Sequence, residues 1–123
     1  MTTTTDLIQH TDQIRRLNDS FRKGEPHANA NLGRWIFTRG VTSLVQGDNA
    51  QMRELLAKVQ SFDSFDEAND PHGEHDFFSF EFKGKTLFAK MDYYDRNIEF
   101  GSENPADPSK TMRVLTIMLS EEY

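Results

Sequence analysis

The segment from Asp76 to Tyr94 constrains the fold most strongly, because apolar and polar residues alternate with period two on both sides of a short turn. A period of two places successive side chains on opposite faces of a β-strand. Lys83 and Gly84 supply the tight turn between the two alternating runs. One face of the pair carries Phe78, Phe80, Phe82, Leu87, Ala89, Met91 and Tyr93. The pattern therefore predicts a β-hairpin with one apolar face.

The turn also predicts the register of this hairpin. Counting outward from it places Asp92 opposite His75. It likewise places Met91 opposite Asp76. Because residues directly opposite one another on two strands are close neighbours, we expect an imidazole and two carboxylates to meet at this end of the hairpin.

Two more strands are expected. Residues 95–97, Asp-Arg-Asn, predict a second turn, followed by a third strand through Ile98 and Phe100. This strand would complete a three-stranded meander. Earlier in the chain, R-W-I-F-T-R-G-V at residues 34–41 is rich in β-branched and aromatic residues, which is typical of a strand that Gly40 ends or bends.

Three segments predict helices. Residues 6–23 place apolar side chains on one helical face, and Gly24 and Pro26 end the segment. Residues 48–60 begin with a capping aspartate and carry an apolar stripe. The Asp-Pro pair that ends at residue 108 starts a last helix, which runs through the broadly apolar residues 111–119.

The predicted fold is therefore a single α+β domain over residues 1–123, with the order α-β-α-β-β-β-α. We expect a mostly antiparallel sheet of about four strands with helices on one face. Apolar residues make up only 36% of the chain, but ten phenylalanines bury enough area each to close a thin core. There is no cysteine, which excludes disulfides, thiolate metal sites and thiol catalysis.

The charge is uneven along the chain. The formal net charge is −6, and the segment between Lys58 and Lys83 contains no Lys or Arg. It carries the carboxylates of Asp63, Asp66, Glu67, Asp70, Glu74, Asp76 and Glu81. Such a segment repels nucleic-acid phosphates and favours a basic protein surface or a cation. The acidic half of the chain is therefore not expected to bind nucleic acid directly.

The N-terminal stretch M-T-T-T-T-D-L-I-Q-H has neither the basic nor the apolar region of a signal peptide. No apolar run approaches the roughly 20 residues that a membrane helix needs. We expect a cytoplasmic protein without a membrane partner, and a homo-oligomer is compatible with the sequence.

The stretch Asn69–Asp76, N-D-P-H-G-E-H-D, concentrates side chains that bind metals or move protons. The candidate ligands of a divalent metal are His72, Glu74, His75 and Asp76. A β-turn at Asp-Pro-His-Gly, with the second histidine bonded to a carbonyl, accounts for the same residue types. Turn chemistry is the favoured interpretation, and no cofactor is required.

A second group of candidates lies around the end of the hairpin. If the protein is an enzyme, the catalytic candidates are His75, Asp92 and Asp95, with Tyr94 beside them. The structural alternative has Asp95 starting a turn and Asp92 in an ion pair. Arg39 and Arg113 are candidate anion clamps or counter-charges for these carboxylates. No glycine-rich phosphate loop, serine elbow or zinc-helix motif is present.

Several motifs carry a resemblance to a known family. They are L-N-D-S-F-R, T-R-G-V, F-D-E-A-N-D-P-H-G-E-H-D-F, K-M-D-Y-Y-D-R, G-S-E-N-P-A-D-P and R-V-L-T-I-M-L-S-E-E-Y. In this order they resemble an uncharacterised bacterial family, domain of unknown function 3768. The resemblance implies no activity, and it implies the character of a small protein carried by plasmids and other mobile elements.

Two functions compete. The first hypothesis is an acidic protein-binding module that docks on a basic protein surface, in the sharper form an inhibitor of a host nucleic-acid-processing or defence system. Its binding candidates are Asp63, Asp66, Glu67, Asp70, Glu74, Asp76, Tyr94, Arg39 and Arg113. The alternative is a metal-dependent hydrolase or nuclease that uses the carboxylate cluster around His75 and Asp92. A toxin or antitoxin partner is a third, weaker idea.

Overall fold

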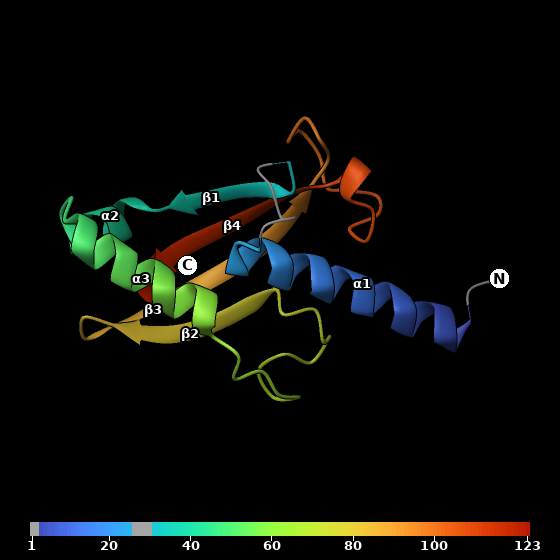
Figure 1. The fold of residues 1–123 in the computed structure, drawn as a ribbon, viewed down its shortest axis with the longest axis horizontal. Helices are drawn as coiled ribbons and strands as arrows, with labels where there is room; N and C mark the ends of the chain where they lie inside the picture. Colours follow the sequence, from blue (N-terminus) through green and yellow to red (C-terminus); the bar gives the residue numbers. More distant parts are fainter. Residues whose placement is uncertain (1–2, 26–30) are drawn as a thin grey trace.

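The computed structural model describes residues 3–25 and 31–123. Its centre is a four-stranded sheet in the order β1-β4-β3-β2 (Figure 1). The strands are β1 (Gly33–Phe37), β2 (Phe77–Phe82), β3 (Lys85–Tyr94) and β4 (Met112–Leu119). β1 runs parallel to β4, and the other two pairings are antiparallel. The expected α+β class with a mostly antiparallel sheet is confirmed.

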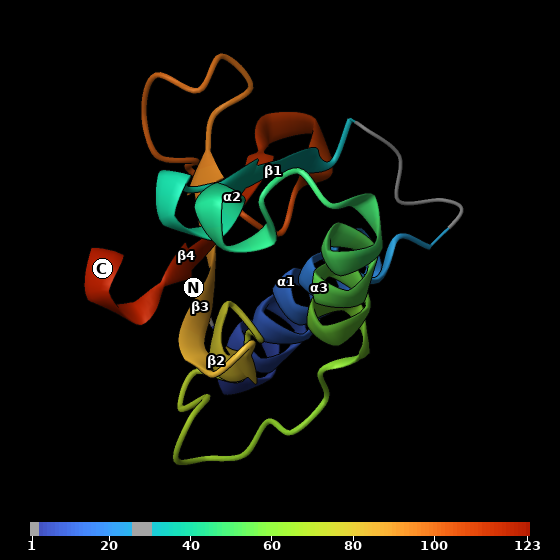
Figure 2. The ribbon, with the colours of Figure 1, turned by 90° about the vertical axis from the view of Figure 1, so that its left-hand side faces the viewer.

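Two long helices, α1 (Thr4–Lys23) and α3 (Asn49–Ser61), lie together on one face of the sheet (Figure 2). The short helix α2 (Arg39–Val45) packs against β4 and α3. Two 3-10 turns, η1 (Pro108–Lys110) and η2 (Ser120–Glu122), flank β4. No helix in the described ranges is long and apolar enough to cross a membrane.

Local sequence explains the ends of the long helices. The Thr3 hydroxyl accepts from the backbone N–H of Asp6, whose carboxylate accepts from the N–H of Thr3, so the two residues form a capping box. Gly24 ends α1 with a φ of 67°, as the sequence predicts. The second predicted stop, Pro26, lies outside the described residues. Asp48 caps α3 by accepting from two backbone N–H groups of its first turn.

The predicted hairpin is confirmed, together with its register. Phe82 pairs with Lys85 across the turn, and Phe77 pairs with Lys90 at the far end. The backbone N–H of Met91 still donates to the carbonyl of Asp76 at 2.8 Å, so the predicted register extends one residue past β2.

The predicted last helix is wrong, because residues 112–119 form β4. This strand lies between β1 and β3, and six of its eight residues are buried. A strand covered on both faces is apolar almost throughout, so it lacks the alternation that marks a half-buried strand. Its sequence, M-R-V-L-T-I-M-L, therefore imitates a buried helix.

The predicted third strand of the meander is also wrong. Residues 95–100 fold as a turn, in which the Asp95 carboxylate accepts from the backbone N–H groups of Asn97 and Glu99, each at 3.1 Å. Ile98 takes a positive φ of 57°. Only an isolated bridge between Tyr94 and Gly101 remains of the expected pairing. Side-chain capping by Asp95 thus replaces the strand ladder.

The first strand is shorter than predicted, because it ends at Phe37 and T-R-G-V begins α2 instead. Thr38 caps this helix by accepting from the N–H of Val41. A β-branched, hydroxyl-bearing residue fits a strand and a helix cap equally well, which explains the misplaced boundary.

The core fills the space between the sheet and the helices. Phe21 of α1, Leu55 and Val59 of α3, and Val41 of α2 meet the inward-facing side chains of the sheet. Those inward-facing side chains include Phe78, Phe82, Leu87, Ala89, Met91, Leu115 and Ile117. This packing leaves the connection between α3 and β2 at the edge of the core.

Candidate functional site

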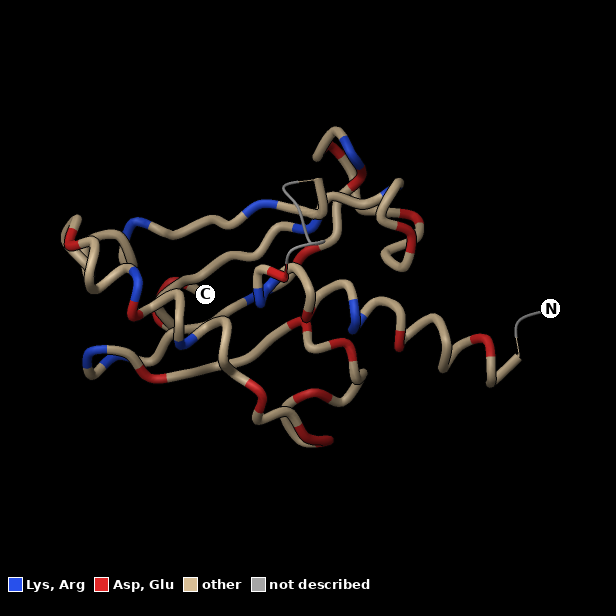
Figure 3. The backbone as a smooth tube through the Cα atoms, viewed as in Figure 1, with Lys and Arg blue, Asp and Glu red and all other residues tan. Residues whose placement is uncertain are grey.

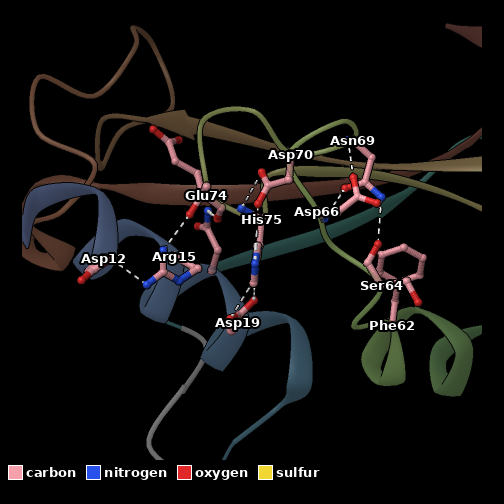
Figure 4. Close-up of polar contacts among 12 residues, drawn as sticks. Asp12, Arg15, Asp19, Phe62, Ser64, Asp66, Asn69, Asp70, Glu74 and His75 are labelled. Carbon is pink, nitrogen blue, oxygen red and sulfur yellow. Dashed lines mark hydrogen bonds and ion pairs between the residues drawn. The ribbon is translucent and has the colours of Figure 1, made fainter. Parts of the chain in front are cut away.

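Residues 62–76, which we call the acidic loop, connect α3 to β2 without forming a helix or strand. Loops of this length are uncommon within a compact domain and are usually either functional or disordered. This one is fixed by polar contacts from α1 (Figure 4). These contacts determine the conformation of the acidic loop.

Two side chains of α1 bind the backbone of the loop. Arg15 donates from Nη1 to the carbonyl of Gly73 at 3.0 Å, and Asn18 donates from Nδ2 to the carbonyl of Glu74 at 2.9 Å. Asp12 holds the Arg15 guanidinium in place at 2.7 Å. Because these carbonyls are satisfied by the helix, the loop needs no strand partner here.

His75 clamps the loop to α1 through its side chain. Its Nδ1 lies 2.9 and 3.1 Å from the two carboxylate oxygens of Asp19, which can only accept, so Nδ1 carries the proton. Its Nε2 lies 3.5 Å from Oδ2 of Asp70. The ring also stacks on Phe65, with centroids 3.8 Å apart. Both ring nitrogens face carboxylates, which suits a clamp better than a catalytic base.

Arg22 anchors the start of the loop from inside the core. Its side chain is almost fully buried and donates from Nη1 to the carbonyls of Val59 (2.7 Å) and Phe62 (3.0 Å). From Nη2 it donates to Asp19 at 3.2 Å. Burial lowers the pKa of Arg22, and the Asp19 carboxylate partly opposes that shift. Asp19 thus joins the Arg22 anchor to the His75 clamp.

Within the loop, Asp66 and Asn69 form a local turn. The Asp66 carboxylate accepts from the N–H groups of Ala68 and Asn69, both at 2.9 Å. Asn69 returns a bond by accepting from the N–H of Asp66 at 2.9 Å. Asp70 is buried and accepts from the N–H of His75 at 3.2 Å. Two of the predicted binding carboxylates therefore shape the loop itself.

A buried network of hydrogen bonds joins the loop to β3 and α1. Tyr93 donates to Glu74 at 2.9 Å, and Asn18 donates to the Tyr93 hydroxyl at 2.7 Å. Burial raises the pKa of Tyr93, with Asn18 opposing that shift and the Glu74 carboxylate adding to it. Glu74 is thus a third binding candidate with a structural partner.

Arg113, predicted on a helix as an anion clamp or as a structural counter-charge, lies on β4 and is fully buried. It donates from Nε to Asn18 at 2.7 Å and from Nη2 to the carbonyl of Pro105 at 2.6 Å. Burial lowers the pKa of Arg113 to about 10. Its contacts make it a scaffold residue. Arg39, by contrast, is exposed on the first turn of α2.

Two carboxylates of the acidic loop form no contact that supports its conformation. Asp63 and Glu67 are exposed, and neither forms a hydrogen bond or ion pair within the described parts of the chain. The loop itself contains carboxylates but no Lys or Arg (Figure 3). Asp63 and Glu67 therefore give this region exposed negative charge that is not ion-paired within the described residues.

The structure does not bring the predicted catalytic residues together. Asp92 pairs with Lys90 at 3.1 Å, and Asp95 caps its own turn. His75 has a positive φ of 55°, which turns it out of the hairpin register and toward α1. Tyr94 lies opposite Met112 at the end of β3. No contact joins His75 to Asp92 among the described residues.

The predicted metal ligands are likewise dispersed. Within residues 3–25 and 31–123, no group of three or more His, Asp or Glu side chains is placed to hold a metal ion. The structure does bring four predicted residues to one pocket of about 380 Å³, namely Asp70, His72, Asp76 and Asp92. Divalent metal binding stays a prediction.

Sequence reasoning missed the residues of α1 that hold the loop. They are Arg15, Asn18, Asp19 and Arg22. Their spacing of three and four residues places them along one stripe of the helix. That polar stripe was the available signal, although the sequence alone does not say what it contacts.

A family model described as "Protein of unknown function (DUF3768)" matches residues 37–122. The chain belongs to the DUF3768 family. The matched region contains the acidic loop, the hairpin and β4, whereas α1 precedes it. No match was found among curated proteins or among solved structures. The function of this DUF3768 protein must therefore be argued from its site.

Proposed function

We propose that this DUF3768 protein is a protein-binding module whose acidic loop docks on a basic surface of another protein. One observation carries the proposal: contacts from α1 fix the loop, while Asp63 and Glu67 are exposed and form no ion pair within the described residues. The carboxylates that shape the loop are different residues from these two.

Pre-ordering favours binding for a general reason. A loop that is already ordered loses little conformational freedom when a partner binds, so more of the interaction energy appears as affinity. The loop reaches this state through neutral and charged contacts with α1, which leave its outward charge in place.

The charge also indicates the class of partner. Like charges across an interface are unfavourable, whereas a Lys- and Arg-rich surface is attracted and steered toward the loop. The same field repels nucleic-acid phosphates. The sharper form of the hypothesis, an inhibitor of a nucleic-acid-processing or defence system, stays a prediction that the identity of the partner would test.

The test is affinity capture from extracts of the cells that produce the protein, with captured proteins identified by mass spectrometry. The loop variant carries Asp63→Lys and Glu67→Lys. Asp66 is left unchanged because it caps the turn of the loop. The matched control carries Glu54→Lys and Glu99→Lys, two exposed positions outside the loop, and changes the net charge equally.

We expect the wild type and the control to capture the same basic protein, and the loop variant to lose it. Capture should also weaken between about 0.05 M and about 0.3 M salt, because exposed charges are screened. Equal capture by the loop variant, or equal loss with both variants, would overturn the proposal.

A further inference from the structure

The pocket of about 380 Å³ lies where the acidic loop meets the sheet. Three separate segments form it: residues 69–72 of the loop, the junction of the loop with β2, and the end of β3, with Tyr123 closing one side. Its lining residues are Asn69, Asp70, Pro71, His72, Asp76, Phe77, Lys90, Met91, Asp92 and Tyr123. It therefore adjoins the proposed docking surface.

Part of the lining is apolar and aromatic. The rings of Phe77 and Tyr123 meet edge to face, with centroids 6.0 Å apart. Phe88 contacts both rings and supports the pair. A ligand in this pocket thus meets aromatic surface as well as charge.

Two carboxylates of the pocket have partners within the described residues. Asp92 is paired with Lys90 at 3.1 Å. Asp70 accepts from the N–H of His75 at 3.2 Å and lies 3.5 Å from its Nε2. Asp76 forms no ion pair in the part of the chain that the structure describes, and its carboxylate bonds only to its own backbone N–H. His72 favours the ionised form of Asp76 but forms no ion pair with it in the described residues.

Asp76 is also poorly solvated. It is half buried, and burial raises its pKa, with repulsion from Glu74 as the next cause. A carboxylate in this condition gains from a cation that reaches it with hydrogen-bond donors. The pocket therefore contains a partly buried carboxylate that has no ion-pair partner among the described residues.

We propose that this pocket receives an arginine side chain of the partner on which the acidic loop docks. The guanidinium donates to the Asp76 carboxylate, and its planar face lies against the Tyr123 ring. The aliphatic stem lies along the Phe77 ring. This inference rests on the proposed function. It adds one defined contact to the general attraction between the acidic loop and a basic surface.

Arginine fits better than the other cations. Lysine offers a point charge without a planar face, so it binds the same carboxylate more weakly. The uncharged isostere citrulline keeps the shape and loses the charge, which makes it a matched control for the ligand. Free arginine adds a carboxylate near Asp70 and Asp92 and should bind less well than a capped arginine.

The experiment is a titration of the isotope-labelled protein with N-acetyl-arginine amide, followed by two-dimensional NMR. We expect saturable shifts in the amides of residues 70–77 and 90–92, with a Kd of about millimolar for so small a ligand. N-acetyl-citrulline amide should give no saturable shifts, and the lysine analogue and free arginine should bind more weakly.

Asp76→Asn should weaken the binding of N-acetyl-arginine amide at least about tenfold, whereas Asp63→Asn should change it less than about twofold. The melting temperatures of both variants report that the fold is kept. Equal binding of citrulline, or equal losses in the two variants, would overturn the arginine pocket.

The two proposals fail separately. If loop-dependent capture persists while the pocket ignores arginine, the docking surface stands and the pocket does not. If Asp76-dependent arginine binding persists while the loop variant still captures its partner, the pocket stands and the docking role of Asp63 and Glu67 does not.

Discussion

Two long irregular connections in the described part of the chain, residues 62–76 and 95–111, are ordered in different ways. The connection of residues 95–111 carries both signs of charge: Lys110 pairs with Glu103 at 3.3 Å, and Arg96 donates to the carbonyl of Thr111 at 3.1 Å. Asp95 caps a turn within this connection. Residues of this connection therefore supply many of the ion pairs and hydrogen bonds that order it.

The acidic loop has carboxylates but no cations of its own. It is held by the guanidinium groups of Arg15 and Arg22, the amide of Asn18 and the Asp19 carboxylate, all of which α1 supplies. Because these contacts come from the helix and from the turn that Asp66 caps, the exposed acids Asp63 and Glu67 take no part in holding the loop. The comparison thus separates the charge that builds the loop from the charge that is free to bind.

The strongest test of this contrast removes the buried anchor. Arg22→Ala should lower the free energy of unfolding by about 3 kcal/mol, because it leaves two buried carbonyls and Asp19 without their donor. Arg16→Ala, on the exposed side of the same helix, should lie within about 0.5 kcal/mol of wild type. Denaturant unfolding measures both variants. Similar values for the two arginines would contradict the anchor.

Removing the clamp should have the next largest effect. His75→Ala should lower the free energy of unfolding by about 1–2 kcal/mol, because it loses the contacts with Asp19 and Asp70 and the stacking on Phe65. His75→Asn should lose somewhat less, since asparagine tolerates the positive φ at this position. Thermal unfolding measures both variants. Melting temperatures equal to that of the wild type would contradict a stabilising role for His75.

Asp76→Asn should stabilise the protein at neutral pH. The pKa of Asp76 is raised above its usual 3.8 in the folded state, so folding binds a proton more tightly and stability falls as pH rises through the folded pKa. The asparagine variant escapes this loss. Because the group is only half buried, we expect a gain below about 1 kcal/mol.

The gain from Asp76→Asn should disappear well below the usual pKa of 3.8, where the carboxyl is protonated in both states. Denaturant midpoints of the two proteins across the acidic range give this difference directly. A gain that persists at the acidic end, or destabilisation at neutral pH, would show that Asp76 already has a favourable partner.

The smallest stability effect is expected from the exposed acids. The double variant with Asp63→Lys and Glu67→Lys should stay within about 0.5 kcal/mol of wild type, because neither side chain supports the loop. The control at Glu54 and Glu99 should behave alike. A larger loss confined to the loop variant would mean that these acids do help to fold it.

The sequence was sufficient for the elements whose local pattern is unambiguous. Alternation around Lys83 and Gly84 predicted the hairpin and its register, and capping residues placed α1 and α3 to within a few residues. It failed at β4, whose burial on both faces erases the strand pattern. It failed again after Tyr94, where a side-chain cap replaces the third strand.

The candidate site divides in the same way. The acidic composition of the loop was visible in the sequence, and so was the set of carboxylates near the end of the hairpin. The partner of His75 was not, because a positive φ turns it from Asp92 to Asp19, a residue far away in the chain. Contacts with α1 decide the role of the side chains in the loop. Local sequence patterns cannot predict such contacts, because the two segments are far apart in the chain.

Amide hydrogen exchange in the acidic loop of the free protein tests the central claim most directly. The backbone N–H groups of Asp70, Gly73 and His75 are all hydrogen-bonded within the loop. A loop that is ordered before any partner binds predicts protection of these amides well above unfolded-chain rates. Exchange of all three at unfolded-chain rates, while the amides of β3 stay protected, would contradict a pre-ordered docking surface.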